Sequence, residues 1–470
     1  MMIAALLGPG LGLLGREVTV GSTAAICSVL GAGHGDLIDP ATLCLRGPRD
    51  PVGLAVSQPG RVAGRLMLPV PQFGGALEVG EPPPADTVPD ELEPGAGVDS
   101  DHAGLTEEPA ISLSRGGLTL SAGYSTVERF RLKAQLTRNF AESGRQISAT
   151  VSYSALRWEA AAGLSATPFL GKRTSFSATA FALRERALGF TDDYGASPFE
   201  QRAVGAEVGL SHAVSRSFSV FTSLRLAREE FRLSQRGQPC DAAIYTGIVC
   251  GELGRGNRAE WALSLALDRR DSPVDPRHGY RLHLGERIVA RRGSLQYLKS
   301  EAGFERHVQY GEEWSIATTV EGGVITKLGG TGAPVFDRFY LGGQSLRGFD
   351  LRGVAPRLTA SAPAGALRAS VGGTYFYTAR AELVGHVGGY LGRNELRPSM
   401  YIEAGSAFGL NRARLLPGET LEADSAAPRI AIGIGVRWPT PIGSVRFDFS
   451  LPLVSRKGDR EQVFSLSVGL

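Results

Sequence analysis

Apolar and polar residues alternate with a period of two along most of the chain from about residue 111 to the end. The alternation is sharpest near the C-terminus, where Ile430, Ile432 and Ile434 occupy every second position. Because successive side chains of a β-strand point to opposite faces, this pattern predicts strands with two chemically different faces. Turn residues interrupt the alternation at spacings of roughly 10 to 25 residues, which is typical of many strands in succession.

The length of these segments favours a barrel that spans a membrane. Segments 147–155 and 429–438 approach the roughly 9–11 residues that a tilted strand needs to cross a bilayer. Residues 111–470, at about 22 residues for each strand and its connection, are enough for about 16 strands, and closed antiparallel barrels need an even number. We therefore predict an all-β fold, a transmembrane antiparallel β-barrel of about 16 strands over residues 111–470. A soluble all-β binding module is the less favoured interpretation.

Residues 1–110 have a different composition. Segment 66–114 contains no Lys or Arg, and its acidic residues stand among prolines and glycines, as in a disordered linker. The apolar opening MMIAALLGPGLGLLG resembles the core of a secretory signal, but it lacks a cationic start and is interrupted by Gly8, Pro9 and Gly10. We expect residues 1–110 to form a largely disordered acidic, Pro/Gly-rich extension with a weak signal segment.

Composition excludes several classes of protein. The 50 Lys and Arg residues nearly balance the 47 Asp and Glu residues, so no nucleic-acid partner is indicated. After the first few residues there is no uncharged apolar run of about 18 residues, so a membrane protein would have to be a closed barrel. The seven histidines show no H-x-x-x-H spacing, and the Gly-rich stretches lack a Walker lysine. We expect no enzyme activity, no cofactor and no metal site.

The four cysteines fall into two groups. Cys27 and Cys44 lie near the start, whereas Cys240 and Cys250 share one polar stretch between two strand-like segments. The second pair would close a short loop, which fits a disulfide in an oxidising compartment. Two unpaired thiols remain the alternative for Cys240 and Cys250.

Residues 339–349 carry the most specific motif, Phe-Tyr-Leu-Gly-Gly-Gln-Ser-Leu-Arg-Gly-Phe. Its Gly-Gly and Arg-Gly-Phe parts resemble a signature of the outer-membrane assembly factor superfamily of BamA and TamA, which shares the bacterial surface antigen barrel domain. The resemblance implies that Arg347, Gly348 and Phe349 form the tip of a long extracellular loop that folds back into the barrel. An isolated Arg-Gly-Phe would instead indicate a surface turn, but the flanking matches argue against it.

An arginine inside a barrel needs carboxylate partners, since an unpaired buried charge is costly. Glu382 and Glu403 each stand alone among apolar or small residues of a strand-like segment. In the family that the motif resembles, the matching positions hold the acids that clamp the loop arginine, although the second is usually Asp. We therefore expect a loop clamp made of Arg347, Gly348, Phe349, Glu382 and Glu403.

Further matches follow the family order over nearly all of 111–470, and the BamA barrel is the nearest likeness. They include a first strand at 118–126, a turn at 268–280 and a penultimate strand at 443–449. Proteins of this family carry POTRA domains before the barrel. Residues 1–110 are too short and too rich in Pro and Gly for one intact copy, so we expect the chain to lack them, unless its start is misassigned.

The resemblance implies a protein of the bacterial outer membrane that assists the insertion of other outer-membrane proteins. In the family, the first and last strands pair weakly, and a client strand adds to the opened edge. Expected partners are outer-membrane lipids, unfolded outer-membrane clients and assembly lipoproteins. The alternative is a pore or structural barrel without insertase activity. The residues expected at the weak seam are Leu118, Leu120, Tyr124, Phe464, Leu466 and Val468.

Overall fold

The computed structural model describes most of the barrel and little of the chain before it. Cys27, Cys44 and most of the expected N-terminal extension lie outside the described residues, and within that extension β1 (Arg65–Met67) pairs with β2 (Glu78–Gly80). The described residues are 65–67, 78–80, 110–113, 116–126, 129–140, 143–155, 157–186, 199–233, 240–273, 275–362, 367–386, 396–410, 415–440 and 443–468.

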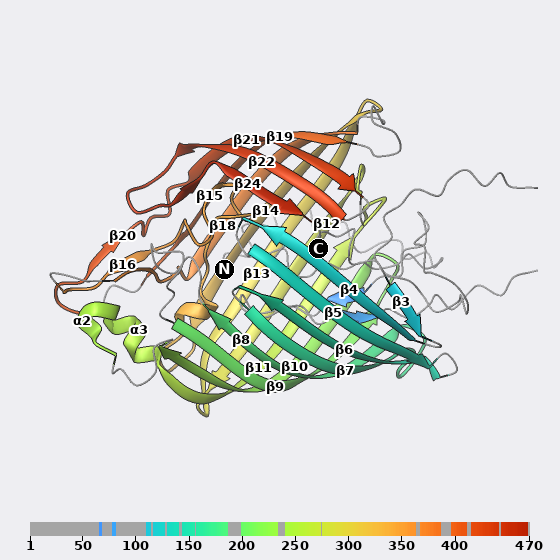
Figure 1. The fold of residues 1–470 in the computed structure, drawn as a ribbon, viewed down its shortest axis with the longest axis horizontal. Coiled ribbons are helices and arrows are strands. Elements are labelled where there is room, and N and C mark those ends of the chain that lie inside the picture. Colours follow the sequence, from blue (N-terminus) through green and yellow to red (C-terminus); the bar gives the residue numbers. More distant parts are fainter. Residues whose placement is uncertain are drawn as a thin grey trace, which may run out of the picture.

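Sixteen antiparallel strands follow one another around a closed barrel, and the short strand β3 (Ala110–Leu113) is added beside the first of them (Figure 1). The predicted fold class and strand number are confirmed. The sixteen strands are β4 (Gly116–Ser125), β5 (Arg129–Phe140), β6 (Arg145–Ser154), β7 (Arg157–Ala166), β8 (Thr174–Arg186), β9 (Phe199–Ala213), β10 (Phe218–Leu233), β11 (Gly254–Asp268), β12 (Gly279–Arg291), β13 (Ser294–Tyr310), β14 (Trp314–Lys327), β18 (Tyr375–Gly385), β19 (Arg397–Phe408), β21 (Arg429–Thr440), β22 (Gly443–Val454) and β24 (Phe464–Val468).

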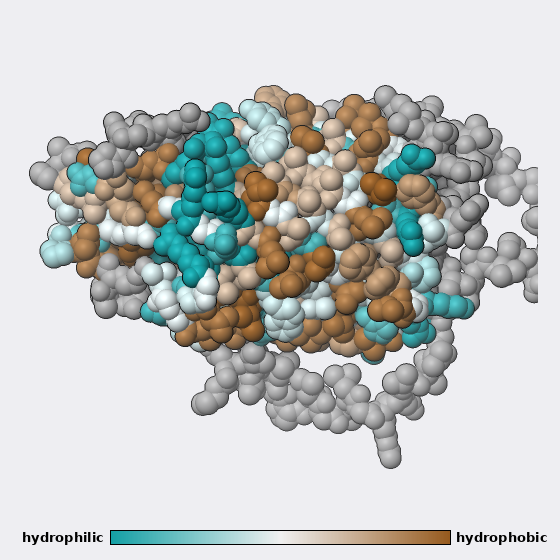
Figure 2. All heavy atoms as spheres, turned by 90° about the horizontal axis from the view of Figure 1, so that it is seen from below, coloured by the Kyte–Doolittle hydropathy of each residue, from teal (hydrophilic) through white to brown (hydrophobic). Residues whose placement is uncertain are grey.

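The two faces of the wall have opposite chemistry. On β5 and β6 the outward residues are apolar, with Leu132 55% and Val151 48% exposed, whereas the inward Gln135 and Ser152 are buried. Figure 2 shows brown and tan residues over the middle of one side, between teal clusters toward either end. An apolar outer face and a polar interior are the arrangement of a barrel that faces lipid, the reverse of a soluble sandwich.

Helices contribute little to the structure. Among the described residues, no helix is long and apolar enough to span a membrane.

The two ends of the barrel differ in their connections. At one end the strands are joined by short segments such as 214–217 and 311–313, while long connections such as 328–374 and 409–428 lie at the other end. Longer loops are typical of the extracellular side of outer-membrane barrels. We refer to this end as the long-loop end.

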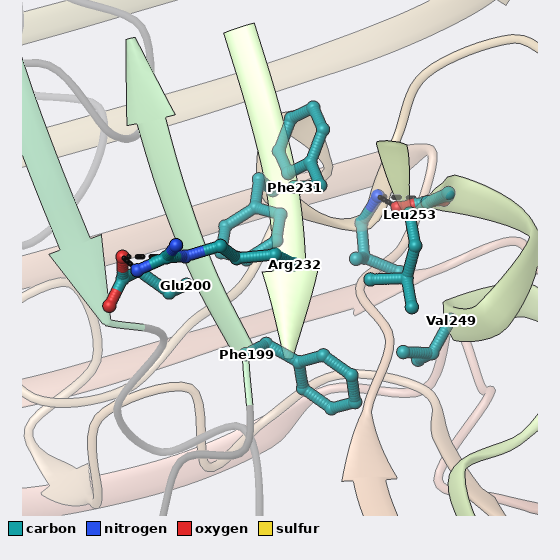
Figure 3. A pocket seen from close by; sticks show the side chains of 9 residues that line it. Phe199, Glu200, Phe231, Arg232, Val249 and Leu253 are labelled. Carbon is teal, nitrogen blue, oxygen red and sulfur yellow. Dashed lines mark hydrogen bonds and ion pairs between the residues drawn. The ribbon is translucent and has the colours of Figure 1, made fainter. Parts of the chain in front are cut away.

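A small folded cap covers the long-loop end (Figure 1). Cys240 and Cys250 form a disulfide within it. The core of the cap joins Phe199 and Phe231 of the barrel rim to Val249, and Figure 3 shows the narrow pocket between these residues. The pocket is part of the packing between rim and cap. The elements of the cap are α2 (Ala242–Tyr245), α3 (Gly247–Glu252), β16 (Arg357–Thr359), β17 (Arg368–Ser370) and β20 (Thr420–Glu422).

The longest connection, residues 328–374 between β14 and β18, turns inward, and we call it the inserted loop. It contains η4 (Val335–Asp337) and β15 (Gly348–Phe349) before the cap strands β16 and β17. Phe339, Leu341 and Leu346 on this loop are buried. The loop therefore packs against other residues along much of its length instead of standing in solvent.

Candidate functional site

Arg347, on the inserted loop, lies among carboxylates from three strands of the wall. Its Nε donates to Oε1 of Glu403 at 2.5 Å, and its backbone N–H donates to Oε2 of the same residue at 2.6 Å. Its two terminal nitrogens lie 3.1 Å from the two oxygens of Glu382, a bidentate pair, and one of them lies 3.2 Å from Asp448. The structure thus brings together the arginine and the two glutamates expected from the sequence.

The cluster around Arg347 balances its charges. Arg380 lies 2.7 Å from Glu403, and Arg446 lies 2.8 Å from Asp448, so three guanidinium groups face three carboxylates. Arg347 is 4% exposed and Glu403 is 1% exposed. Buried charges are tolerated only when they are paired and hydrogen-bonded, and every charge of this cluster is paired. The paired charges hold the loop tip in one orientation.

Strand periodicity explains how the wall supplies these groups. Arg380 and Glu382 are two residues apart on β18, and Arg446 and Asp448 are two residues apart on β22. Residues at this spacing share one face of a strand, here the inward one. The planar ring of Tyr401, two residues before Glu403, lies under the guanidinium of Arg347 with 3.3 Å from Cζ to the ring centre. Such cation–π stacking further fixes the plane of the arginine.

The backbone after Arg347 requires glycine. Gly348 has φ +90°, and a Cβ there would lie 2.9 Å from Cβ of Ala431 and 3.3 Å from Cβ of Ser450. A side chain at this position would be strained and would collide with the wall. Phe349 follows it into the interior and is 1% exposed. In the Arg-Gly-Phe motif, the arginine therefore forms ion pairs with the wall, the glycine lets the backbone pack closely against the wall, and the phenylalanine is buried in the interior.

Sequence reasoning missed Asp448 as a partner of Arg347. The signal was present, because Asp448 stands between Phe447 and Phe449 in an alternating strand, as Glu403 stands among apolar residues of its own strand. Arg380 and Arg446, the two other basic residues of the cluster, lie on predicted strand segments, but sequence reasoning did not identify them as part of the cluster.

A second charged cluster holds the inserted loop elsewhere in the barrel, with the acid on the loop and the base on the wall. Asp337 of η4 lies 2.7 Å from Arg258 of β11 and accepts a hydrogen bond from the hydroxyl of Tyr297 at 2.5 Å. Lys299 donates to the backbone carbonyl of Asp337 at 3.3 Å. Burial opposes ionisation of the carboxyl, but Arg258, the hydroxyl of Tyr297 and Arg291 together outweigh it and hold the pKa of Asp337 below its usual value.

The barrel closes between its first and last spanning strands, β4 and β24, which we call the seam. Two residue pairs are in register there, Ser125 with Ser467 and Tyr124 with Val468. β24 has five such pairs with β22, whereas the other neighbouring spanning strands have from nine to fifteen. Among the described residues, the seam is the least paired junction of the wall.

Part of the β4 edge is paired by a segment from before the barrel. β3 pairs with Gly116 to Thr119 at the start of β4, whereas β24 pairs with Tyr124 and Ser125 at its end. Among the described residues, no partner at this edge of β4 is paired with the stretch from Leu120 to Gly123, which lies between the parts paired with β3 and with β24.

The residues expected at the seam lie on β4 and β24. Leu118 pairs with β3, Leu120 is exposed on the outer face, and Tyr124 packs edge-on against Phe130. On the last strand, Phe464 stacks at a tilt on Phe449, and Leu466 and Val468 follow at every second position.

Comparison with known proteins gives a family match for most of the chain. Residues 139–470 match the Omp85 superfamily domain. The chain is 28% identical over 209 residues to the outer membrane protein assembly factor BamA of Neorickettsia risticii, covering 44% of this chain and 26% of that protein. It is 25% identical over 224 residues to a sorting and assembly machinery component 50 homolog of Xenopus laevis, covering 47% of each. The chain thus spans between a quarter and half of the length of these relatives.

A solved structure shares the fold. The crystal structure of BamA from Haemophilus ducreyi lacking POTRA domains 1–3 matches with a TM-score of 0.63 and 18% identity, covering 76% of this chain and 70% of that one. At this level of identity the match concerns the architecture of the barrel.

Proposed function

Because the chain belongs to the Omp85 superfamily and forms a BamA-like barrel of the bacterial outer membrane, we propose that it assists the insertion of other outer-membrane proteins through its seam. A client strand would add to the edge of β4 or β24 by backbone hydrogen bonds, as an extended peptide adds to any open sheet edge. Its partners would be unfolded outer-membrane proteins, assembly lipoproteins and the surrounding lipids, and it would perform no enzymatic reaction.

The seam is the observation that carries this proposal. Within the part of the chain that the structure describes, β4 and β24 share two residue pairs, Ser125 with Ser467 and Tyr124 with Val468, whereas neighbouring spanning strands that do not include β24 share nine or more. Each strand pair in a membrane must satisfy its backbone groups internally, so a short register leaves donors and acceptors that another strand can take. A stably closed pore or structural barrel has no need of such a junction.

Locking the seam tests the proposal directly. Ser125→Cys with Ser467→Cys places two cysteines at paired positions. In liposomes that contain the oxidised variant, we expect unfolded client barrels to insert at the rate of empty liposomes, and reduction to restore the faster rate. The matched control is Ser165→Cys with Ser177→Cys, a paired position between β7 and β8 in the fully paired wall.

Two results would contradict the proposal. Insertion at the unlocked rate through the locked seam is one, and unchanged levels of other outer-membrane barrels after depletion of the protein in cells is the other. Steady ion conductance in planar bilayers that does not respond to locking would favour the alternative, a passive pore. The inserted loop and its two charged clusters argue against a wide open lumen.

A further inference from the structure

The segment that leads into the last strand is tied to the tip of the inserted loop. β23 (Glu461–Gln462) pairs with β15, with Gly348 opposite Gln462 and Phe349 opposite Glu461. The pairing continues beyond these strands, because the N–H of Asp350 donates to the carbonyl of Arg460 at 2.9 Å. The loop that carries Arg347 is therefore continuous, through backbone hydrogen bonds, with the start of β24.

An ion pair reinforces this contact. The guanidinium of Arg460 binds the carboxylate of Asp350, which is buried, and the N–H of Arg460 donates to the carbonyl of Gly353 at 3.1 Å. A Cβ at Gly353 would lie 2.6 Å from that same arginine's carbonyl oxygen and 2.7 Å from the carbonyl of Asp350, so no larger residue fits. We call Asp350, Gly353 and Arg460 the loop–strand link.

The described part of the last strand, residues 464–468, has few other backbone attachments. Besides its five residue pairs with β22 and two with β4, it is held at its start by the bond from the N–H of Ser450 to the carbonyl of Val463 at 2.8 Å. The loop–strand link acts just before that point. Gln462 also donates from Nε2 to the hydroxyl of Thr126 at 3.3 Å, and the N–H of Thr126 donates to the carbonyl of Leu466 at 3.0 Å. The loop–strand link therefore lies close in sequence to the residues that connect the last strand with the end of β4.

We propose that the loop–strand link positions β24 against β4, so that the inserted loop holds the seam closed. Asp350 and Arg460 are positioning residues in this arrangement, because they act on the seam through the segment between them and β24. Release of the link would free the start of the last strand without breaking its pairs with β22. That the link regulates insertion rests on the proposed function. That the link holds the seam closed does not depend on that function.

The seam cysteines provide the test. Purified protein carrying Ser125→Cys with Ser467→Cys is oxidised without clients, and the rate of disulfide formation is measured with Asp350→Asn or Arg460→Gln added. We expect a slower rate, because the two thiols can form the disulfide only while the seam is closed and release of the link lowers the closed fraction. Arg460→Lys keeps the cation and should recover part of the rate. Single-cysteine variants correct for the cysteines already in the chain.

Two matched controls decide the outcome. Arg255→Gln removes an ion pair between β10 and β11, with Glu230, away from the segment before β24, and should leave the seam rate unchanged. Ser165→Cys with Ser177→Cys reports on the intact wall. An unchanged seam rate in Asp350→Asn and Arg460→Gln would overturn the proposal, and so would an equal slowing at the control pair, which indicates general loosening. Because no client is present, this experiment tests the position of the last strand and does not depend on whether the protein inserts clients.

Discussion

Arg347 and Glu403 are joined twice, because both the backbone N–H and the side-chain Nε of the arginine donate to the two oxygens of one carboxylate. The carboxylate therefore fixes the backbone of the loop tip as well as its guanidinium. Glu382 and Asp448 contact only the side chain of Arg347. Of the three acids, Glu403 alone can specify where the loop tip enters the wall.

Arg347→Ala should strongly destabilise the folded barrel, because it leaves three buried carboxylates with one cation fewer. Breaking a buried ion pair by removing one partner costs about 3–5 kcal/mol. We expect the temperature at which the heat-modifiable band shifts on gels to fall clearly. Glu422→Gln, which removes the ion pair between the cap and the exposed Lys457, serves as the control and should shift it little. A mobility shift like that of the wild type would speak against a buried clamp.

Glu403→Gln should be more damaging than Asp448→Asn. An amide in place of the Glu403 carboxylate can accept only one of the two hydrogen bonds from Arg347 and leaves Arg380 without its anionic partner. Asp448, in contrast, contacts the side chain of Arg347 and not its backbone. Without the Asp448 carboxylate, Arg446 keeps Glu382 at 3.7 Å. Thermal denaturation of the two variants in the same detergent gives the comparison. Equal midpoints would contradict the special role of Glu403.

The second cluster should show strong coupling between Asp337 and Arg258. A double-mutant cycle with Asp337→Asn and Arg258→Gln should give a coupling energy in the range of about 0.5–3 kcal/mol, toward its upper end because both groups are buried. The matched control is Glu230→Gln with Arg255→Gln, a pair between β10 and β11, where the arginine is 67% exposed. Exposed pairs contribute about 0.2–1 kcal/mol. Similar coupling in the two cycles would contradict the buried anchor.

Acid should weaken the second cluster. The pKa of Asp337 lies below its usual value of 3.8 in the folded protein, so this group stabilises the fold fully at higher pH and its contribution is lost as the pH falls below about 3.8. The difference in thermal midpoint between the wild type and Asp337→Asn should therefore be constant near neutral pH and shrink in acid. A difference independent of pH down to about 2.5 would be inconsistent with this assignment.

Removing the disulfide should loosen the cap and leave the wall intact. Cys240 and Cys250 are ten residues apart, and closing a loop of this length restricts the unfolded chain by about 3 kcal/mol. In Cys240→Ser with Cys250→Ser we expect faster proteolysis within segment 240–253 and an unchanged heat-modifiable shift. Loss of that shift would mean that the cap is needed for the barrel itself.

Much of the fold could be predicted because strand periodicity is a local property. The alternation around Ile432 and around Leu120 identifies strands and distinguishes the lipid face from the interior, and residue counting gives sixteen strands. The closeness of Cys240 and Cys250 in sequence favoured a disulfide over two unpaired thiols, and the structure has the disulfide. Arg347 could be singled out because it belongs to a family-like motif, and Glu382 and Glu403 because each is an isolated acid in a strand segment.

Partners that are distant in sequence could not be predicted in the same way. Asp448 is 101 residues from Arg347, and Arg258 is 79 residues from Asp337. Which inward residue meets which loop residue depends on the register of every strand between them, and register is a cooperative outcome of the whole wall.

The sequence by itself therefore indicated the class of the fold and strands with two chemically different faces, because both depend on side chains within one segment. The charged tip of the inserted loop was expected from the resemblance of residues 339–349 to a family motif. Only the tertiary structure decided that Asp350 meets Arg460 and that, among the described residues, Ser125 and Tyr124 pair with Ser467 and Val468 across the seam. Those contacts join segments that are 110 or more residues apart in sequence and meet only when the sheet closes, so no local pattern encodes them.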